Sequence, residues 1–239
     1  AQMFADTELL EIHVPDAAAE AGAFYVIVQT KRLALDTSKN IIVHFFVERA
    51  LVSLAYEASG PEPELEELRT RVQALSRLFK FEFRFRADKP FDRIFEETLG
   101  RMAQNGELLS EGGRLRPGAG HHGWSGAEWL ENYAALLVNF VEGYLVTARA
   151  LRKLVKTSLS EKELVKRALA LGQEMFLAGE IERPEAVSKP IVLNALQAFV
   201  DHGYLVHRQD YDLAEGYTSE EALSGVEHGL RAYLPRGAP

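Results

Sequence analysis

The residues best suited to acid–base chemistry are His207 and Asp212, which are separated by four residues in the run His-Arg-Gln-Asp-Tyr-Asp. A histidine at this spacing can act as a general base on a hydroxyl group while the acid orients its ring, provided that the two side chains meet within hydrogen-bond distance. The chain holds seven histidines and 35 acidic residues, so the spacing arises easily by chance. We interpret the pair as coincidental.

Metal ligation is the second chemistry that the sequence suggests. His44 and Glu48 are four residues apart, on one face of an expected helix. A zinc site needs a third and usually a fourth ligand, and the apolar neighbours of His44 favour a hydrogen-bonded core histidine instead. His121 and His122 lie in the glycine-rich stretch 117–126, which we interpret as a solvated loop because adjacent side chains seldom converge.

Other catalytic signatures are absent from the sequence. It contains no Gly-Lys-Ser/Thr phosphate loop, no G-x-G-x-x-G ahead of a helix and no G-x-S-x-G nucleophile turn. Its lack of cysteine removes disulfides, thiol nucleophiles and cysteine zinc sites, and suits a reducing compartment. We therefore predict no catalytic residue, no metal and no cofactor in this chain.

Charge and hydropathy limit the classes of partner that we expect this chain to bind. The net charge of −8 repels nucleic acid phosphates, and Lys and Arg are scattered rather than clustered, so we predict no nucleic acid partner. The most apolar run, 41–55, is interrupted by His44, Glu48 and Arg49 and falls short of the ~18 residues that span a bilayer. It predicts a helix over 41–58, capped by Ser38 or Asn40, that is apolar almost all round.

The remaining elements follow from periodicity and capping signals. Strands are predicted at 24–29 and at 79–86, where four Phe alternate with four charged residues, and a hairpin is predicted over 107–116. Apolar spacing predicts helices at 65–79 and 91–105. Ser-x-x-Glu boxes at 125 and 160 predict a long helix over 126–156 and another ending near Gly179. Further helices are predicted from Ser188 to Gly203 and from a Thr218 cap onward.

These elements predict a mostly α fold with a few short strands and hairpins. We divide the chain into a lead-in with one strand at 1–31 and a helical domain at 32–239, with two subdomains that could meet near 110–126. Two segments, 95–109 and 196–206, share the order helix, glycine, strand and turn, and 211–213 could supply a return strand after the second. This order is that of a winged-helix unit, although a helix followed by a plain hairpin would give the same pattern.

Several motifs occur in order along residues 32–207. They are Arg32-Leu-Ala-Leu-Asp36 with Lys39-Asn40-x-x-x-His44-Phe45-Phe46, Leu78-Phe-Lys-Phe-Glu82-Phe83, Phe91–Leu109, Phe140-Val-Glu-Gly-Tyr144, Leu169–Glu182, and Ser188-Lys-Pro190 with Asn194-Ala-Leu196. In kind and order these motifs resemble the C-terminal region of the glycerol-3-phosphate / dihydroxyacetone-phosphate acyltransferase family. In that family the catalytic H-x4-D motif lies N-terminal to this region and precedes a phosphate-binding loop. Residues 213–239 contain no such loop, which supports a coincidental His207–Asp212 spacing.

The resemblance implies an enzyme of phospholipid synthesis. The intact protein would transfer an acyl group from acyl-carrier protein or acyl-CoA to the 1-hydroxyl of glycerol 3-phosphate, and this chain would be its non-catalytic C-terminal accessory domain. The implied partner is the catalytic acyltransferase domain, with Lys39, Asn40, His44, Phe45 and Phe46 as candidate contacts. The expected location is cytoplasmic, at the membrane face. A winged-helix-like transcriptional regulator and a helical ligand-binding or scaffold domain remain the alternatives.

Overall fold

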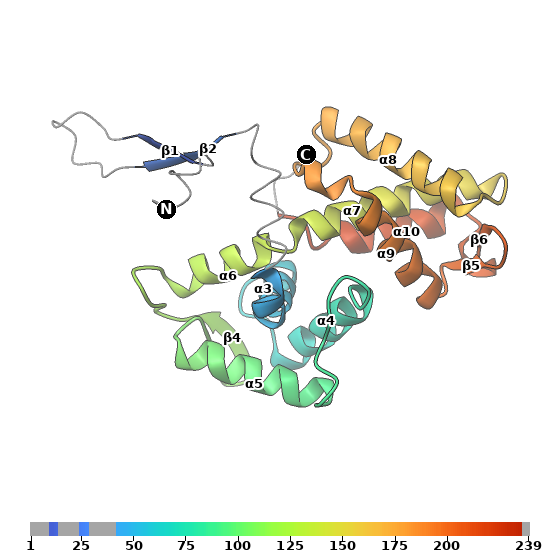
Figure 1. The fold of residues 1–239 in the computed structure, drawn as a ribbon. Coiled ribbons are helices and arrows are strands. Elements are labelled where there is room, and N and C mark those ends of the chain that lie inside the picture. Colours follow the sequence, from blue (N-terminus) through green and yellow to red (C-terminus); the bar gives the residue numbers. More distant parts are fainter. Residues whose placement is uncertain (1–9, 14–23, 29–41, 236–239) are drawn as a thin grey trace. The chain divides into compact units, whose positions relative to one another are not determined.

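The computed structural model describes residues 10–13, 24–28 and 42–235 (Figure 1). The chain divides into two compact units, residues 1–44 and 45–239. In the first unit, β1 (Leu10–His13) pairs antiparallel with β2 (Phe24–Ile27), with Leu10 opposite Ile27 and His13 opposite Phe24. The strand predicted at 24–29 is therefore confirmed over Phe24–Ile27. The predicted helix caps Ser38 and Asn40 lie outside the described residues.

The second unit is mostly helical, as predicted. Its helices are α3 (Val47–Ser59), α4 (Leu65–Leu78), α5 (Phe91–Gln104), α6 (Gly126–Ala135), α7 (Val138–Ala150), α8 (Glu161–Leu177), α9 (Lys189–Asp201) and α10 (Glu220–Arg231). Its paired strands are β3 (Leu108–Glu111) with β4 (Arg114–Pro117), and β5 (Leu205–His207) with β6 (Tyr211–Leu213). The first hairpin was predicted from Gly112-Gly113, and the second from the strand after Gly203 with Tyr211–Leu213 as a return strand.

The first half of this unit has the full order of a winged-helix unit. Helix α3 is followed by an extended residue, Glu64, which bridges antiparallel to Arg114 of β4. Helices α4 and α5 come next, and α5 leads through Gly106 into the β3–β4 hairpin. Gly106 has a φ of +68°, a left-handed conformation that glycine adopts without a steric penalty and that ends a helix.

The second half repeats this order. Helix α7 is followed by Leu159, which bridges antiparallel to Tyr211 of β6, and then by α8, α9 and the β5–β6 hairpin. Gly203, with a φ of +72°, occupies the place that Gly106 has in the first half. The helix–glycine–hairpin similarity in the sequence therefore reflects two winged-helix-like repeats, which we call repeat 1 (α3 to β4) and repeat 2 (α7 to β6). Figure 1 shows α4 and α5 near α3, and α8 and α9 near α7.

Helix α7 is the centre of repeat 2. Every residue from Val138 to Ala148 is buried, and α8, α9 and α10 all pack on it. Glycine permits two of these contacts. A Cβ on Gly143 would lie 2.4 Å from the Cγ2 of Ile191 in α9, and one on Gly172 of α8 would lie 3.0 Å from the Cγ1 of Val146.

Helix α3 has the same central role in repeat 1. Residues 50–56 are all buried, against α4, α5 and α6. The all-round apolar character that marks this helix in the sequence is therefore explained by burial in the core. It begins at Val47 rather than at 41, because Val43–Phe45 form a 3-10 turn.

Three predicted features of the secondary structure are wrong, and the first is the strand at 79–86. Residues 79–86 form no strand: the amides of Glu82 and Phe83 bond to the carbonyl of Phe79, which makes a helical turn. Phe79 and Phe83, four residues apart, are thereby buried together, whereas Phe81 faces solvent. Packing of Phe79 and Phe83 in the core outweighs their strand propensity, because no partner strand lies beside this segment in the described residues.

The predicted helix 126–156 is broken. It ends at Ala135 as α6, restarts at Val138 as α7 with a bend of 43°, and finishes as a 3-10 turn over Leu151–Val155. The bend lets α6 pack on α3 while α7 packs in repeat 2. In the part of the chain that is described, no single helix is long and apolar enough to cross a bilayer, although this bent pair together reaches that length and composition.

The cap of the last helix is Ser219 instead of Thr218. Ser219 has an extended backbone, and its hydroxyl accepts from the amide of Ala222 at 3.2 Å. Thr218 has a helical backbone at the end of a 3-10 turn, so it cannot serve as the cap. The caps at Ser125 and Ser160 are confirmed, and Ser125 with Glu128 forms the complete reciprocal box.

Candidate functional site

His207 and Asp212 do not meet. In the β5–β6 hairpin, His207 is opposite Tyr211 and stacks on its ring at 4.0 Å, whereas Asp212 is opposite Val206 and accepts from the hydroxyl of Ser158 at 3.0 Å. Successive residues of a strand point to opposite faces, so the two side chains lie on different sides of the hairpin. The hairpin therefore does not bring the two side chains together.

The candidate metal residues His44 and Glu48 lie on either side of the start of α3. His44 is exposed in the 3-10 turn before α3, so its interpretation as a core histidine is wrong. The predicted helix would have placed His44 in the core, but α3 begins three residues later, at Val47. Glu48 instead accepts from the hydroxyl of Thr98 at 3.2 Å and pairs with Arg101. Within residues 10–13, 24–28 and 42–235, no group of three or more potential ligands is close enough to hold a metal.

The other candidate contact residues differ in their surroundings. Lys39 and Asn40 lie outside the described residues. Phe45 is 80% exposed, whereas the next residue, Phe46, is half-buried and stacks on Tyr133 of α6 with ring centroids 6.0 Å apart. The segment before α3 therefore places one aromatic ring in solvent directly beside one that is fixed in the protein.

The hydroxyl of Tyr133 donates to a buried carboxylate, that of Glu107, which was not predicted from the sequence. The Glu107 side chain is only 1% exposed and lies within 3.2 Å of polar groups on four other residues. These are Arg49 Nε at 3.2 Å, Asn105 Nδ2 at 3.2 Å, His121 Nε2 at 3.1 Å and the Tyr133 hydroxyl at 3.1 Å. Burial, followed by the charge of Glu107, raises the pKa of Tyr133 to about 12, so the phenol remains a donor. We call this the Glu107 cluster.

The glycine-rich loop is part of this cluster, so the prediction of a solvated loop is wrong for His121. The loop packs so closely that side chains are excluded: a Cβ would lie 2.2 Å from the Gly106 carbonyl oxygen at Gly118, and 1.9 Å from the Trp124 oxygen at Gly120. These contacts hold His121 against Glu107. The burial of Glu107, which follows Asn105-Gly106, could not be predicted from the sequence, because burial of a carboxylate depends on tertiary contacts.

An aromatic ladder extends from the cluster to the surface. It runs Phe46, Tyr133, Trp129 and Trp124, with successive ring centroids 6.0, 5.5 and 5.0 Å apart, and His121 stacks on Trp129 at 4.5 Å. Trp124 is 43% exposed. The ladder and the Glu107 cluster thus connect the start of α3 with the glycine-rich loop through one rigid framework.

A second polar group joins three of the motifs that marked the family in the sequence. The amide of Asn194 in α9 donates to Oε2 of Glu82 at 2.9 Å, and Tyr144 of α7 lies beside Glu82. Burial raises the pKa of Glu82 to about 7, although nearby Asn194 and Tyr144 oppose the rise. Oε1 of Glu82 and the Tyr144 hydroxyl are buried without a regular hydrogen bond to any described residue. A protonated Glu82 could donate to Tyr144 and satisfy both atoms.

Aromatic rings surround this polar group. Phe79 contacts Tyr144 edge to face at 5.1 Å, and Phe83 contacts Phe140 in the same way at 5.0 Å. Within the Phe-Val-Glu-Gly-Tyr motif, Glu142 has a separate role, because its carboxylate accepts from the amides of Glu182 and Arg183 at 2.9 and 3.0 Å. These motif residues therefore join α4, α7 and α9 and support the fold.

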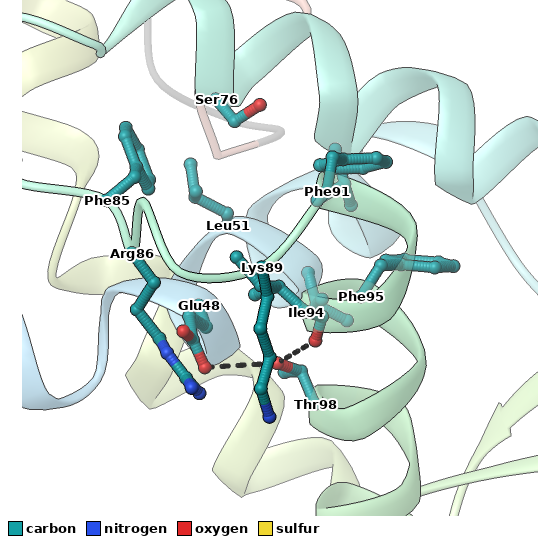
Figure 2. A pocket seen from close by; sticks show the side chains of 12 residues that line it. Glu48, Leu51, Ser76, Phe85, Arg86, Lys89, Phe91, Ile94, Phe95 and Thr98 are labelled. Carbon is teal, nitrogen blue, oxygen red and sulfur yellow. Dashed lines mark hydrogen bonds between the residues drawn. The ribbon is translucent and has the colours of Figure 1, made fainter.

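The described part of repeat 1 also contains a pocket of about 200 Å³ (Figure 2). Apolar side chains from α3, α4 and α5 form its walls: Leu51, Val52, Val72, Phe91, Ile94 and Phe95, with Phe85 from the loop before α5. In Figure 2, Arg86, Lys89, Glu48 and Thr98 gather at one end, and Phe85, Ser76 and Phe91 lie at the other. This pocket was not predicted, because two of its lining residues, Phe85 and Arg86, belong to the segment that was wrongly predicted to be a strand.

Comparison with known proteins agrees with the order of the motifs. The family described as the glycerol-3-phosphate acyltransferase C-terminal region matches residues 7–208. No curated protein matches the chain. The matched range includes both winged-helix-like repeats up to His207 of β5, together with the Glu107 cluster and the Glu82 group. The chain belongs to the glycerol-3-phosphate acyltransferase C-terminal region family.

Proposed function

We propose that this chain is the non-catalytic accessory region of a glycerol-3-phosphate 1-O-acyltransferase and packs against the catalytic acyltransferase domain. The observation that carries the proposal is the pair Phe45 and Phe46 at the end of the Lys39–Phe46 motif. Phe46 is fixed on Tyr133, while Phe45 is 80% exposed. A large apolar side chain held in solvent at a defined position is suited to act as an interface anchor.

The supporting framework makes this anchor rigid. Phe46 stacks on Tyr133, whose hydroxyl donates to Glu107, and Glu107 in turn binds Arg49 on the first turn of α3. Anchors that are ordered before binding lose less conformational entropy when a partner covers them. We propose that the Lys39–Phe46 segment is the contact with the catalytic domain and that the Glu107 cluster holds its C-terminal end in place.

The positions of the acids and histidines support a non-catalytic role. His207 and Asp212 lie on opposite faces of a hairpin, so the H-x4-D spacing forms no catalytic pair there. Catalysis of acyl transfer would therefore belong to the partner domain, with acyl-CoA or acyl-carrier protein as donor. Because the product is a membrane lipid precursor, we place the intact enzyme in the cytoplasm, at the membrane face.

The winged-helix order does not favour a DNA-binding function. A recognition helix must present a basic, exposed face to the major groove. The exposed residues of α9 include one base, Lys189, and one acid, Asp201. The exposed face of α5 also mixes acids with bases, as Asp92 and Glu96 lie among Arg93 and Arg101. The repeats are better explained as a scaffold that holds α3 and α7 in the core.

A binding measurement with a matched control tests the proposal. The purified chain would be titrated into the acyltransferase domain of the same enzyme, and the dissociation constant measured by calorimetry. Phe45→Asp should weaken binding at least ten-fold, whereas Leu177→Asp should not, although Leu177 is equally exposed at 84%. Wild-type binding that Phe45→Asp leaves unchanged would contradict the proposed contact, as would equal effects of the two variants.

A further inference from the structure

We propose that the pocket of repeat 1 binds the end of a single alkyl chain that carries an anionic head group, such as an alkyl carboxylate or an alkyl phosphate. The inference is independent of the proposed docking contact, because the pocket lies between α3, α4 and α5 and contains neither Phe45 nor the aromatic ladder. It adds a ligand site to a region for which only a supporting role has been proposed above.

The size of the pocket fits a chain end. A cavity of about 200 Å³ is smaller than the roughly 300–1,000 Å³ of sites for whole cofactors or drug-sized molecules. An apolar cavity of about 150 Å³ accommodates benzene, with six carbons, so this pocket has room for roughly eight. Its walls are side chains of Leu, Val, Ile and Phe, which offer no hydrogen bonds to the interior of a ligand.

The charged groups are confined to the rim, which makes the pocket amphipathic; the hydroxyl of Ser76 at the apolar end donates to the carbonyl of Gln73. Figure 2 shows the Arg86 guanidinium and the Lys89 ammonium beside Glu48 at one end, away from Phe85 and Phe91. The ion-paired side chains around this rim comprise four cations and three carboxylates: Arg86, Lys89, Arg93 and Arg101 against Glu48, Asp88 and Glu97. The rim therefore has an excess of one positive charge.

The cations can reach an added anion. Arg86 has five N–H donors, of which Asp88 engages two within 3.2 Å, and its contact with Glu97 is 3.7 Å long. These pairs are partly exposed, and exposed ion pairs contribute little free energy, so an incoming anion could exchange with them at small cost. The charge of Glu48 is countered by Arg101, while Thr98 donates a hydrogen bond to it.

Chain length gives the first test. Calorimetric titration of the 239-residue chain with alkyl carboxylates from butanoate to dodecanoate should show affinity rising about four-fold for each added methylene. The rise should stop near eight carbons, where the pocket is full. The absence of saturable binding by any of these chains, or affinity that does not depend on chain length, would overturn the inference.

Head group and site are tested by variants. Octanoate and octyl phosphate should both bind at least ten-fold more tightly than octanol or octylammonium, and their ratio distinguishes a carboxylate ligand from a phosphate ligand. Arg86→Gln with Lys89→Gln should remove the preference for anions, whereas Arg114→Gln with Arg116→Gln, a matched pair on the β3–β4 hairpin, should not. Octylammonium binding as tightly as octanoate, or anion preference retained in the first double variant, would overturn the inference.

A substitution that fills the pocket tests whether the alkyl chain binds there. Ser76 of α4 lines the apolar end, and Ser76→Phe would place a ring where the chain end is expected. This variant should lose at least ten-fold in octanoate affinity while its circular dichroism spectrum stays unchanged. If Ser76→Phe folds and binds octanoate as the wild type does, the chain binds elsewhere. The rim variants remain decisive should Ser76→Phe not fold, since Arg86 and Lys89 are partly exposed.

Discussion

Replacement of Glu82 by Gln should make the protein more stable at alkaline pH and leave it unchanged at acidic pH. Burial raises the pKa of Glu82 from 4.5 to about 7 in the folded protein, while the unfolded chain keeps the lower value. Between these values the folded state binds more protons than the unfolded state. The free energy of unfolding therefore falls as pH rises through this interval, and the loss is complete above the folded pKa.

The magnitude follows from the size of the shift. Each unit corresponds to about 1.4 kcal/mol, so the shift sets an upper limit of about 3 kcal/mol. Glu82 is only half-buried as a residue, and screening by solvent reduces this limit, so we expect about 1–2 kcal/mol. Glutamine carries no charge at any pH, and its carbonyl oxygen can still accept from the Asn194 amide.

Urea unfolding followed by circular dichroism at pH 4.5, 6 and 8 would measure the effect. Glu82→Gln should be more stable than the wild type at pH 8, and the difference should vanish at pH 4.5. Glu111→Gln is the control, because the bond from Arg116 lowers the pKa of Glu111 and its replacement should give no gain at pH 8. A Glu82→Gln variant that is less stable than the wild type at pH 8, or a difference that does not change with pH, would refute the reasoning.

Three further substitutions test the packing and the buried carboxylates by the same unfolding assay. Gly143→Ala should lower the free energy of unfolding by about 1–3 kcal/mol, because its Cβ would overlap Ile191. Gly100→Ala, in an exposed part of α5, should raise it by about 0.5–1 kcal/mol. Equal effects of the two substitutions would contradict the close α7–α9 contact. Glu107→Gln should cost about 3 kcal/mol because it leaves Arg49 without its charged partner, and a neutral result would show that the cluster is not a structural hub. Glu142→Leu should cost about 2 kcal/mol or more by leaving two part-buried backbone amides without an acceptor, and Glu142→Gln should recover part of the loss. Equal losses in the two variants would argue against this acceptor role.

The helices and hairpins could be predicted because their signals are local. Helix α5 has regular apolar spacing from Phe91 to Met102, and α6 begins at the Ser125–Glu128 capping box. Each hairpin follows a helix that ends at a glycine with positive φ, which is why the repeated order was visible in the sequence. The bridges of Glu64 and Leu159 that complete the winged-helix-like repeats were not predicted, since a single bridging residue has no sequence pattern.

The errors and omissions arose where tertiary contacts decide the conformation. The alternating Phe residues at 79–85 have an ideal strand pattern, yet Phe79 and Phe83 pack on Tyr144 and Phe140 in a helical turn. The bend between α6 and α7 has no proline or glycine to mark it. Glu107 could not be identified as a buried centre, because three of its four polar neighbours, Arg49, His121 and Tyr133, come from other segments of the chain.

The motifs that identified the family have structural roles in the described residues. Glu82, Tyr144 and Asn194 form one buried polar group, and Glu142 accepts two backbone amides from the segment after α8. Phe46 is fixed in the aromatic ladder, and Phe45 remains exposed. This division supports the proposal that the family motifs maintain a scaffold and present one contact surface.

The central claim, that this chain supports acyl transfer without performing it, is tested most directly by an activity assay on separated domains. Transfer of a radiolabelled acyl group to glycerol 3-phosphate would be measured for the chain alone, for the catalytic domain alone, and for the two combined. We expect no transfer by the chain alone and higher activity in the mixture than with the catalytic domain alone, and Phe45→Asp should reduce that gain. Acyl transfer by the 239-residue chain on its own would contradict it.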